Sequence, residues 1–263
     1  EEAAAILGVD IQPKAQPQLP RLFALGETVY ACHDLETPDG EPILTGTRGT
    51  ITRLYNRIGG GTQSFDDVVH AEKRLVLEEM FANAVTHLGH QLSLLTSADR
   101  RWCDLTRHEL TVAIREIMAG LGVYRIYRRM NAECRPEDAR EIEHACAEAV
   151  RRNSRRDAQP FEFVRDLLIG RYPPPSATVE YRVGLWRWVL TFQQYTGAVM
   201  AKAVEDTAFY VYNRFIALNE VGGNPAAFGR NVAEFHGENA PRRAVIPQTQ
   251  LATSTHHTKL GED

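Results

Sequence analysis

Apolar residues recur every three or four positions from about residue 65 onward, and this spacing constrains the fold more than any other feature of the chain. Residues three and four apart lie on the same face of an α-helix, so these side chains form one apolar stripe. The pattern predicts a single long helix over residues 65–96 whose stripe packs into a core. The stripe consists of Leu77, Phe81, Ala84, Leu88, Leu92 and Leu95.

Signals for the starts and ends of further helices follow this stretch. Residues 106–109 read TRHE, which fits a capping box, and the helix that it begins should end at Gly120 or Gly122. Pro136 is placed as the first residue of another helix, because proline is tolerated in the first turn. A shorter helical pattern ends at Gly170. The region should therefore form several packed helices.

The pattern changes after the prolines at 173–175. An aromatic-rich helix is expected over 179–192 and another over 205–218, followed by a turn at 219–225. Residues 251–255 read LATST, a short β-prone run that suits a buried strand. Helices followed by a strand-containing tail do not complete an α/β domain, so the chain resembles an insertion plus the next portion of a larger fold.

The first part of the chain carries few periodic signals. Several prolines and glycines interrupt residues 1–60, and residues 28–32 (TVYAC) are the best candidate for a short strand there. We therefore predict a mainly α chain with an irregular segment at 1–60, a helical domain at 61–172 and a different portion at 173–263.

Charge and cysteine usage exclude several classes of protein. The formal net charge of −4 argues against a nucleic-acid partner, which needs a basic face. The chain contains no run of about 18 apolar residues, so no membrane segment is expected. Its four scattered cysteines, Cys32, Cys103, Cys134 and Cys146, form no metal-binding spacing and suit a reducing cytoplasm. We therefore expect a cytoplasmic protein.

Polar and aromatic residues are interleaved in the last third of the chain. Sugar sites use aromatic rings against the apolar faces of pyranoses, and charged or amide groups against the hydroxyls. Aromatic residues at helical spacing belong to a core more often than to a site. Composition alone therefore leaves both interpretations open.

Longer runs of residues carry a resemblance. Residues 192–225 read FQQYTGAVMAKAVEDTAFYVYNRFIALNEVGGNP, residues 251–256 read LATSTH, and residues 123–127 read VYRIY. These runs resemble the maltooligosyl trehalose synthases of the α-amylase superfamily. The similarity is strongest over about 185–263, moderate over 65–170 and poor before residue 60.

The resemblance implies a fold and a reaction. The fold would be a helical insertion domain plus an incomplete portion of a (β/α)8 barrel, with 173–263 as the late-barrel portion. The reaction would convert the reducing-end α-1,4 linkage of a maltooligosaccharide into an α,α-1,1 linkage, without a cofactor or a metal. Such retaining chemistry needs a carboxylate nucleophile and a carboxylic acid about 5–5.5 Å apart. In the family both precede the helical insertion, and no counterpart is visible in this chain.

The resemblance also assigns residues of the site. His256, Lys259, Lys202 and Tyr210 match substrate-binding positions of the family. His257 stands where the family has the third catalytic carboxylate, and an imidazole cannot replace an anion that supports an oxocarbenium-like state. His257 is therefore predicted not to function in catalysis.

Some other positions match the family but have no assigned catalytic role, and others differ from it. Glu205 and Asp206 match, and we favour a structural role for them, such as an ion pair with Arg214 or capping of the helix. Leu260 replaces the arginine of the family motif, and Ala198 replaces a proline.

Two hypotheses follow. The chain is part of a trehalose-forming enzyme and is inactive alone, or it is a degenerate, non-catalytic relative that binds an α-glucan or another protein. The matching pocket residues favour the first hypothesis, and His257 favours the second.

Overall fold

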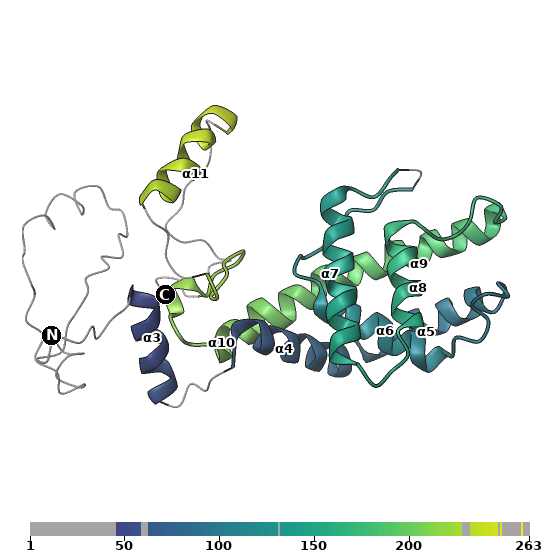
Figure 1. The fold of residues 1–263 in the computed structure, drawn as a ribbon, viewed down its shortest axis with the longest axis horizontal. Coiled ribbons are helices and arrows are strands. Elements are labelled where there is room, and N and C mark those ends of the chain that lie inside the picture. Colours follow the sequence, from purple (N-terminus) through teal and green to yellow (C-terminus); the bar gives the residue numbers. More distant parts are fainter. Residues whose placement is uncertain are drawn as a thin grey trace, which may run out of the picture. The chain divides into compact units, whose positions relative to one another are not determined.

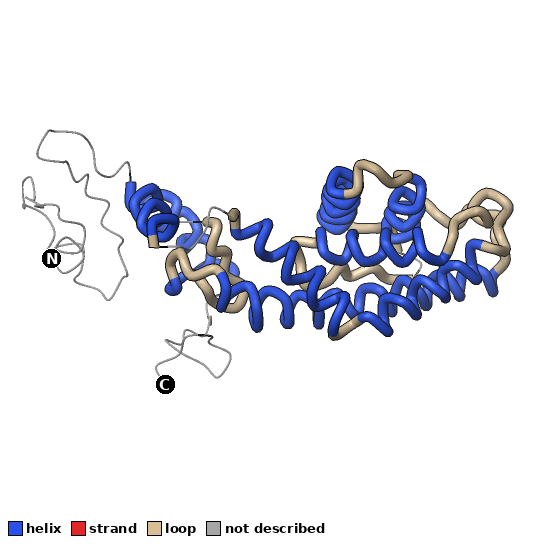
Figure 2. Tube along the Cα trace, turned by 90° about the horizontal axis from the view of Figure 1, so that it is seen from below, coloured by secondary structure: helices blue, strands red, loops and turns tan. Residues whose placement is uncertain are grey.

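The computed structural model describes residues 46–58, 63–130, 132–227 and 232–246, together with residues 248 and 259. Helices dominate these ranges, which contain no strand (Figures 1 and 2). The predicted mainly α class is confirmed. The predicted strands at 28–32 and 251–255 lie outside the described residues.

The chain divides into two compact units. Ser64–Val211 form one unit, and residues 1–63 with 212–263 form the other. Residues 173–211 thus belong to the same compact unit as residues 64–172. The three-segment division predicted above refers to a larger barrel and stays a prediction.

The unit Ser64–Val211 is a layered arrangement of helices. Helix α4 packs against α6 and η1, α5 packs against α6 and α9, and α7 and α8 cover α6. Figure 1 shows α7 and α8 side by side. The elements are α4 (Phe65–Glu79), α5 (Ala82–Thr96), α6 (Arg107–Gly120), α7 (Pro136–Arg152), α8 (Gln159–Ile169), α9 (Val179–Met200), the π-helix η1 (Ala201–Ala208) and α10 (Phe209–Val211).

The described part of the other unit is smaller. It contains α3 (Gly46–Arg57), the 3-10 helix η2 (Ile216–Leu218) and α11 (Val232–Val245). The rings of Tyr55 and Tyr212 lie 5.6 Å apart between their centroids. The predicted turn at 219–225 directly follows η2, and within it the Gly223 N–H donates to the carbonyl oxygen of Glu220.

The core of the unit Ser64–Val211 forms where α5, α6, α8 and α9 meet. Trp188 on α9 is 2% exposed, and its indole N–H donates a 2.9 Å hydrogen bond to the carbonyl oxygen of Leu88. The bond satisfies the polar edge of a ring that is otherwise surrounded by apolar side chains. Fully buried members of this core include Leu92, Leu110, Ile114, Ile117, Phe161, Phe163, Leu168 and Phe192.

Three predicted helix boundaries are confirmed. Thr106 caps α6 through a complete capping box with Glu109. Helix α7 begins at Pro136, and α8 ends before Gly170, whose φ of 91° lies in the left-handed region. Local sequence signals set these ends: Thr106 satisfies a free N–H of α6, Pro136 has no N–H to leave unpaired, and Gly170 adopts the left-handed conformation without strain.

Two predicted helices are wrong in part. The expected single helix over 65–96 is interrupted at Met80 and Phe81, whose N–H groups both donate to the carbonyl oxygen of Val76. The expected helix over 205–218 does not exist as such. The chain instead continues from α9 through η1 and α10 and resumes helical hydrogen bonding only at Ile216–Leu218.

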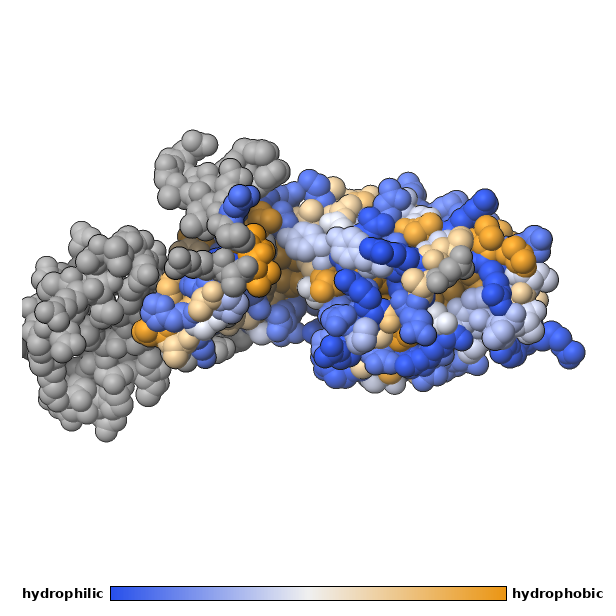
Figure 3. Space-filling model, turned by 90° about the horizontal axis from the view of Figure 1, so that it is seen from above, coloured by the Kyte–Doolittle hydropathy of each residue, from blue (hydrophilic) through white to orange (hydrophobic). Residues whose placement is uncertain are grey.

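The described surface is mixed in polarity. Figure 3 shows apolar patches between charged residues on the visible face. Exposed apolar side chains of the unit Ser64–Val211 include Leu75, Met80, Leu94, Tyr127 and Tyr210. Among the described residues, no helix combines the length and the hydropathy needed to cross a membrane.

Candidate functional site

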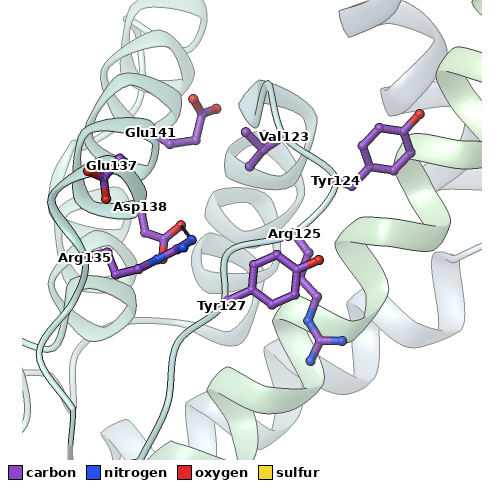
Figure 4. Close-up of a pocket in the computed structure, with 8 residues that line it drawn as sticks. All are labelled: Val123, Tyr124, Arg125, Tyr127, Arg135, Glu137, Asp138 and Glu141. Carbon is purple, nitrogen blue, oxygen red and sulfur yellow. Dashed lines mark hydrogen bonds and ion pairs between the residues drawn. The ribbon is translucent and has the colours of Figure 1, made fainter. Parts of the chain in front are cut away.

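A groove of about 520 Å³ lies beside the N-terminal half of α7. One wall is α7 with the residues just before it, and the other is the segment of residues 121–128 that follows α6, here called the connecting segment. Figure 4 shows the two walls with their side chains. The lining residues are Val123, Tyr124, Arg125, Tyr127, Arg135, Glu137, Asp138 and Glu141.

The start of the connecting segment is fixed from two helices. Leu121 leaves α6 in an extended conformation, with a ψ of 127°. The ammonium group of Lys73 on α4 donates a short hydrogen bond to the Leu121 carbonyl oxygen. The N–H of Gly122 donates a short hydrogen bond to the carboxylate of Glu141 on α7. Both polar groups of this bend are therefore paired with side chains.

Lys73 is itself buried, with 3% of its surface exposed. Burial lowers the pKa of its ammonium group from 10.5 to about 8, and the charge of Glu141 acts in the opposite direction. A buried cation at this position costs free energy, and it is retained where it satisfies a buried carbonyl.

The end of the connecting segment is fixed by α9. The Gln193 amide accepts a 3.1 Å hydrogen bond from the N–H of Arg128 and donates a 3.3 Å bond to the carbonyl oxygen of the same residue. Gln193 is 2% exposed, and Ile126 between the two ends is fully buried. The segment is thus held at both ends, with Tyr124 and Tyr127 facing outward at 39% and 59% exposure.

Tyr124 joins the groove to the π-helix. Its hydroxyl makes a short hydrogen bond to the carboxylate of Glu205 on η1. Helix η1 spans Ala201–Ala208 and reads AKAVEDTA. The Thr207 hydroxyl donates a 2.8 Å bond to the carbonyl oxygen of Lys202, five residues earlier. A π-helix is rare and frequently marks a functional site.

Lys202 and Tyr210, two of the predicted substrate-binding residues, lie on or next to this element. The Lys202 ammonium forms a 2.8 Å ion pair with Asp206, and both side chains are partly exposed. Tyr210 on α10 is 55% exposed. Glu205 therefore contacts Tyr124, and Asp206 contacts Lys202. The predicted structural role named neither partner.

The other predicted residues cannot all be placed. His256 and His257 lie outside the described residues. The backbone N–H of Lys259 lies 3.3 Å from each carboxylate oxygen of Glu220. In the same turn, buried Asn219 donates a 2.7 Å bond to the carbonyl oxygen of Tyr212.

The charges of the groove are nearly balanced. Arg135 and Asp138 form two hydrogen bonds of 2.9 Å, and Glu141 accepts the Gly122 N–H. Within the described part of the chain, no group of three or more histidine, cysteine or acidic side chains is placed to hold a metal ion. The groove offers aromatic surface together with hydrogen-bond donors and acceptors, which is the chemistry of a site for a neutral, hydroxyl-rich ligand.

Sequence reasoning did not predict this groove. It joins residues 123–127, which the resemblance singled out, to residues 135–141, which were interpreted only as the start of a helix. Exposed Tyr127 between buried Ile126 and buried Arg128 follows the alternation of an extended segment with one outward face.

Comparisons with known proteins agree with the resemblance. A putative maltooligosyl trehalose synthase of Mycobacterium tuberculosis is 54% identical over 71 residues, which are 27% of this chain and 9% of that protein. No protein-family model matches the chain. The chain spans about a tenth of the length of the curated relatives that it matches.

Solved structures extend the similarity over more of the chain. The maltooligosyltrehalose synthase from Arthrobacter ramosus is 26% identical, with a TM-score of 0.59, over 78% of this chain and 23% of that one. A mutant of the same enzyme is 25% identical, with a TM-score of 0.60, over 80% of this chain and 23% of that one. The described helices are therefore similar to part of a larger protein.

Proposed function

We propose that this chain, which is related in sequence and structure to part of the maltooligosyl trehalose synthases, is part of an α-glucan-rearranging enzyme. The reaction breaks the α-1,4 linkage to the reducing-end glucose of a maltooligosaccharide. The same glucose is rejoined through its anomeric oxygen in an α,α-1,1 linkage. The released glucose must stay in the site between the two steps, so the protein has to enclose it.

The observation that carries this proposal is the π-helix η1 with its sequence AKAVEDTA. It lies in the run of residues 192–225 that resembles the family, and it supplies both a cation at Lys202 and carboxylates at Glu205 and Asp206. A match to the family over a run as long as residues 192–225 is hard to obtain by chance. The similarity to two solved synthase structures supports the same assignment.

Individual residues have different roles in this proposal. Lys202 and Tyr210 contact the glucose that is rearranged, Lys202 through its ammonium group and Tyr210 through its exposed ring. His256 hydrogen-bonds the reacting glucose, and Lys259 lies near the acceptor side. These groups bind and orient the sugar, and none of them is a nucleophile for glycosyl transfer.

We further propose that the chain does not catalyse the reaction alone. Retaining transfer needs a nucleophile and an acid, and no residue of this chain matches those of the family. His257 occupies the position of the third carboxylate. A histidine there would give no anionic support to an oxocarbenium-like transition state.

A non-catalytic, glucan-binding role is the second candidate, and His257 is the observation that favours it. Both candidates predict that maltopentaose binds to the chain. Their predictions differ when a related synthase supplies the missing carboxylates. Turnover is then expected if the chain is part of an enzyme, and is not expected if the chain only binds glucan.

The first experiment incubates the 263-residue chain and its His257→Asp variant with maltopentaose. Binding is followed by calorimetry and products by chromatography. We expect binding without conversion for both proteins. Formation of maltooligosyl trehalose by either protein alone would show that the catalytic groups are present after all, and absence of binding would exclude both candidates.

A further inference from the structure

We propose that the groove between the connecting segment and α7 is itself a binding site for an α-glucan chain, with Tyr127 as the ring on which a glucosyl unit stacks. The inference rests on the proposed function and adds a second contact region to Lys202 and Tyr210. The volume of about 520 Å³ lies within the range of about 300–1,000 Å³ that is usual for ligand sites.

The aromatic wall of the groove is accessible and oriented. Tyr127 is 59% exposed, although a phenol ring of this size is normally packed against its own protein. The guanidinium carbons of Arg125 and Arg135 lie 5.7 Å and 5.9 Å from its ring centroid. Both cations lie over part of the ring, and the 59% of Tyr127 that stays exposed can contact the C–H groups of a pyranose.

The polar groups of the groove suit hydroxyl groups. Glu137 on α7 supplies an exposed carboxylate that can accept hydrogen bonds (Figure 4). Arg125 lines the same groove, and its guanidinium group supplies N–H donors for hydroxyl oxygens.

The charge of the lining selects among ligand classes. Two arginines face three carboxylates, and the Arg135–Asp138 pair neutralises one of each sign. An anion would meet Glu137 and Glu141, and a cation would meet Arg125. An uncharged polyol meets donors and acceptors together, which favours a sugar chain.

The backbone of the groove is rigid before any ligand binds. Lys73 and Glu141 hold the start of the connecting segment, and Gln193 holds its end through two hydrogen bonds. Little conformational entropy is then lost when a sugar contacts the exposed tyrosines. Tyr124 lines the groove and is bonded to Glu205 on η1, the element that also carries Lys202.

Calorimetric titration of the 263-residue chain with maltopentaose tests the inference. Tyr127→Ala should weaken binding roughly tenfold, because it removes the stacking surface. Tyr127→Phe should keep most of the affinity, since the ring remains. Leu94→Ala, which truncates an equally exposed side chain on α5, should bind like the unchanged chain.

The outcomes separate this inference from the proposed function. If Tyr127→Ala binds maltopentaose like the unchanged chain and Tyr210→Ala binds it weakly, the groove is not a glucan site and the proposed function stands. If the unchanged chain does not bind maltopentaose, both fail.

Hydrogen exchange at backbone amides tests the location of the binding site without any substitution. With maltopentaose present, we expect slower exchange at the backbone amides of residues 123–127 and 137–141. Slower exchange confined to residues 201–211 would overturn the inference even if Tyr127→Ala does not fold.

Discussion

Gln193 on α9 pairs with both backbone polar groups of Arg128, accepting from its N–H at 3.1 Å and donating to its carbonyl oxygen at 3.3 Å. The two residues are separated by 65 positions, and the pair is buried. At the end of the connecting segment, one side chain thus makes the two backbone hydrogen bonds that a neighbouring strand would make in a sheet. The pairing satisfies the buried N–H and carbonyl oxygen of Arg128, which no helix or strand pairs.

Replacing Gln193 with Leu should destabilise the unit Ser64–Val211. The substitution keeps the volume of the side chain but leaves a buried N–H and a buried carbonyl oxygen without partners. We expect a loss of roughly 2–4 kcal/mol in the free energy of unfolding, measured by urea denaturation. Gln194→Leu is the matched control: its neighbouring side chain is exposed, so the change should stay within about 0.5 kcal/mol. Equal losses in the two variants would contradict the role given to Gln193.

Lys73 should make stability depend on pH on the alkaline side. Burial lowers the pKa of its ammonium group from 10.5 to about 8, so between these values the unfolded chain binds the proton more strongly than the folded chain. Stability contributed by this group therefore rises as pH increases through 8 toward 10.5, and the cost of the buried charge is complete below pH 8.

The measurement is the free energy of unfolding between pH 7 and 9.5 for the unchanged chain and for Lys73→Met. Because Met cannot titrate, the difference between the two proteins should shift in favour of the unchanged chain as pH rises. A difference that stays constant over this range would mean that Lys73 has its ordinary pKa in the folded protein.

Gly89 should not tolerate alanine although it lies inside α5. A Cβ atom at this position would lie 3.0 Å from the Cβ and 3.2 Å from the Cα of Thr111 on α6. The gain in helix propensity, about 1 kcal/mol, is outweighed by separation of the two helices, and we expect a net loss of roughly 1–3 kcal/mol.

Gly197 on α9 supplies the comparison for Gly89. The nearest heavy atom to a Cβ there is the Tyr124 carbonyl oxygen at 3.7 Å, an ordinary contact. Gly197→Ala should therefore raise the melting temperature, while Gly89→Ala lowers it. A rise in both variants would show that α5 and α6 can separate without cost.

Local signals predicted the ends of helices but not the interruptions within them. Thr106 and Pro136 were identified correctly because capping is a property of a few adjacent residues. The break at Met80 and Phe81 contains neither glycine nor proline, and the apolar stripe runs through it without a change. The break separates α4, which packs on η1, from α5, which packs on α9, so tertiary packing decides it.

The candidate site shows the same division between local and long-range information. Lys202 and Tyr210 were assigned from the resemblance, and both lie within one short stretch of η1 and α10. The π-helical geometry was not predicted, although buried residues of this stretch recur five positions apart, Ala203 with Ala208 and Val204 with Phe209. The contact between Tyr124 and Glu205 joins positions 81 residues apart and needs the fold to be known.

A chimera tests the central claim most directly. Residues 64–211 form a compact unit, and they would replace the matching segment of the Arthrobacter ramosus synthase, whose remaining segments stay unchanged. We predict that the folded chimera forms maltooligosyl trehalose from maltopentaose, and that Lys202→Met in the chimera lowers the rate at least tenfold. A chimera that melts cooperatively and binds maltopentaose but yields no maltooligosyl trehalose would contradict the claim that this chain is part of such an enzyme.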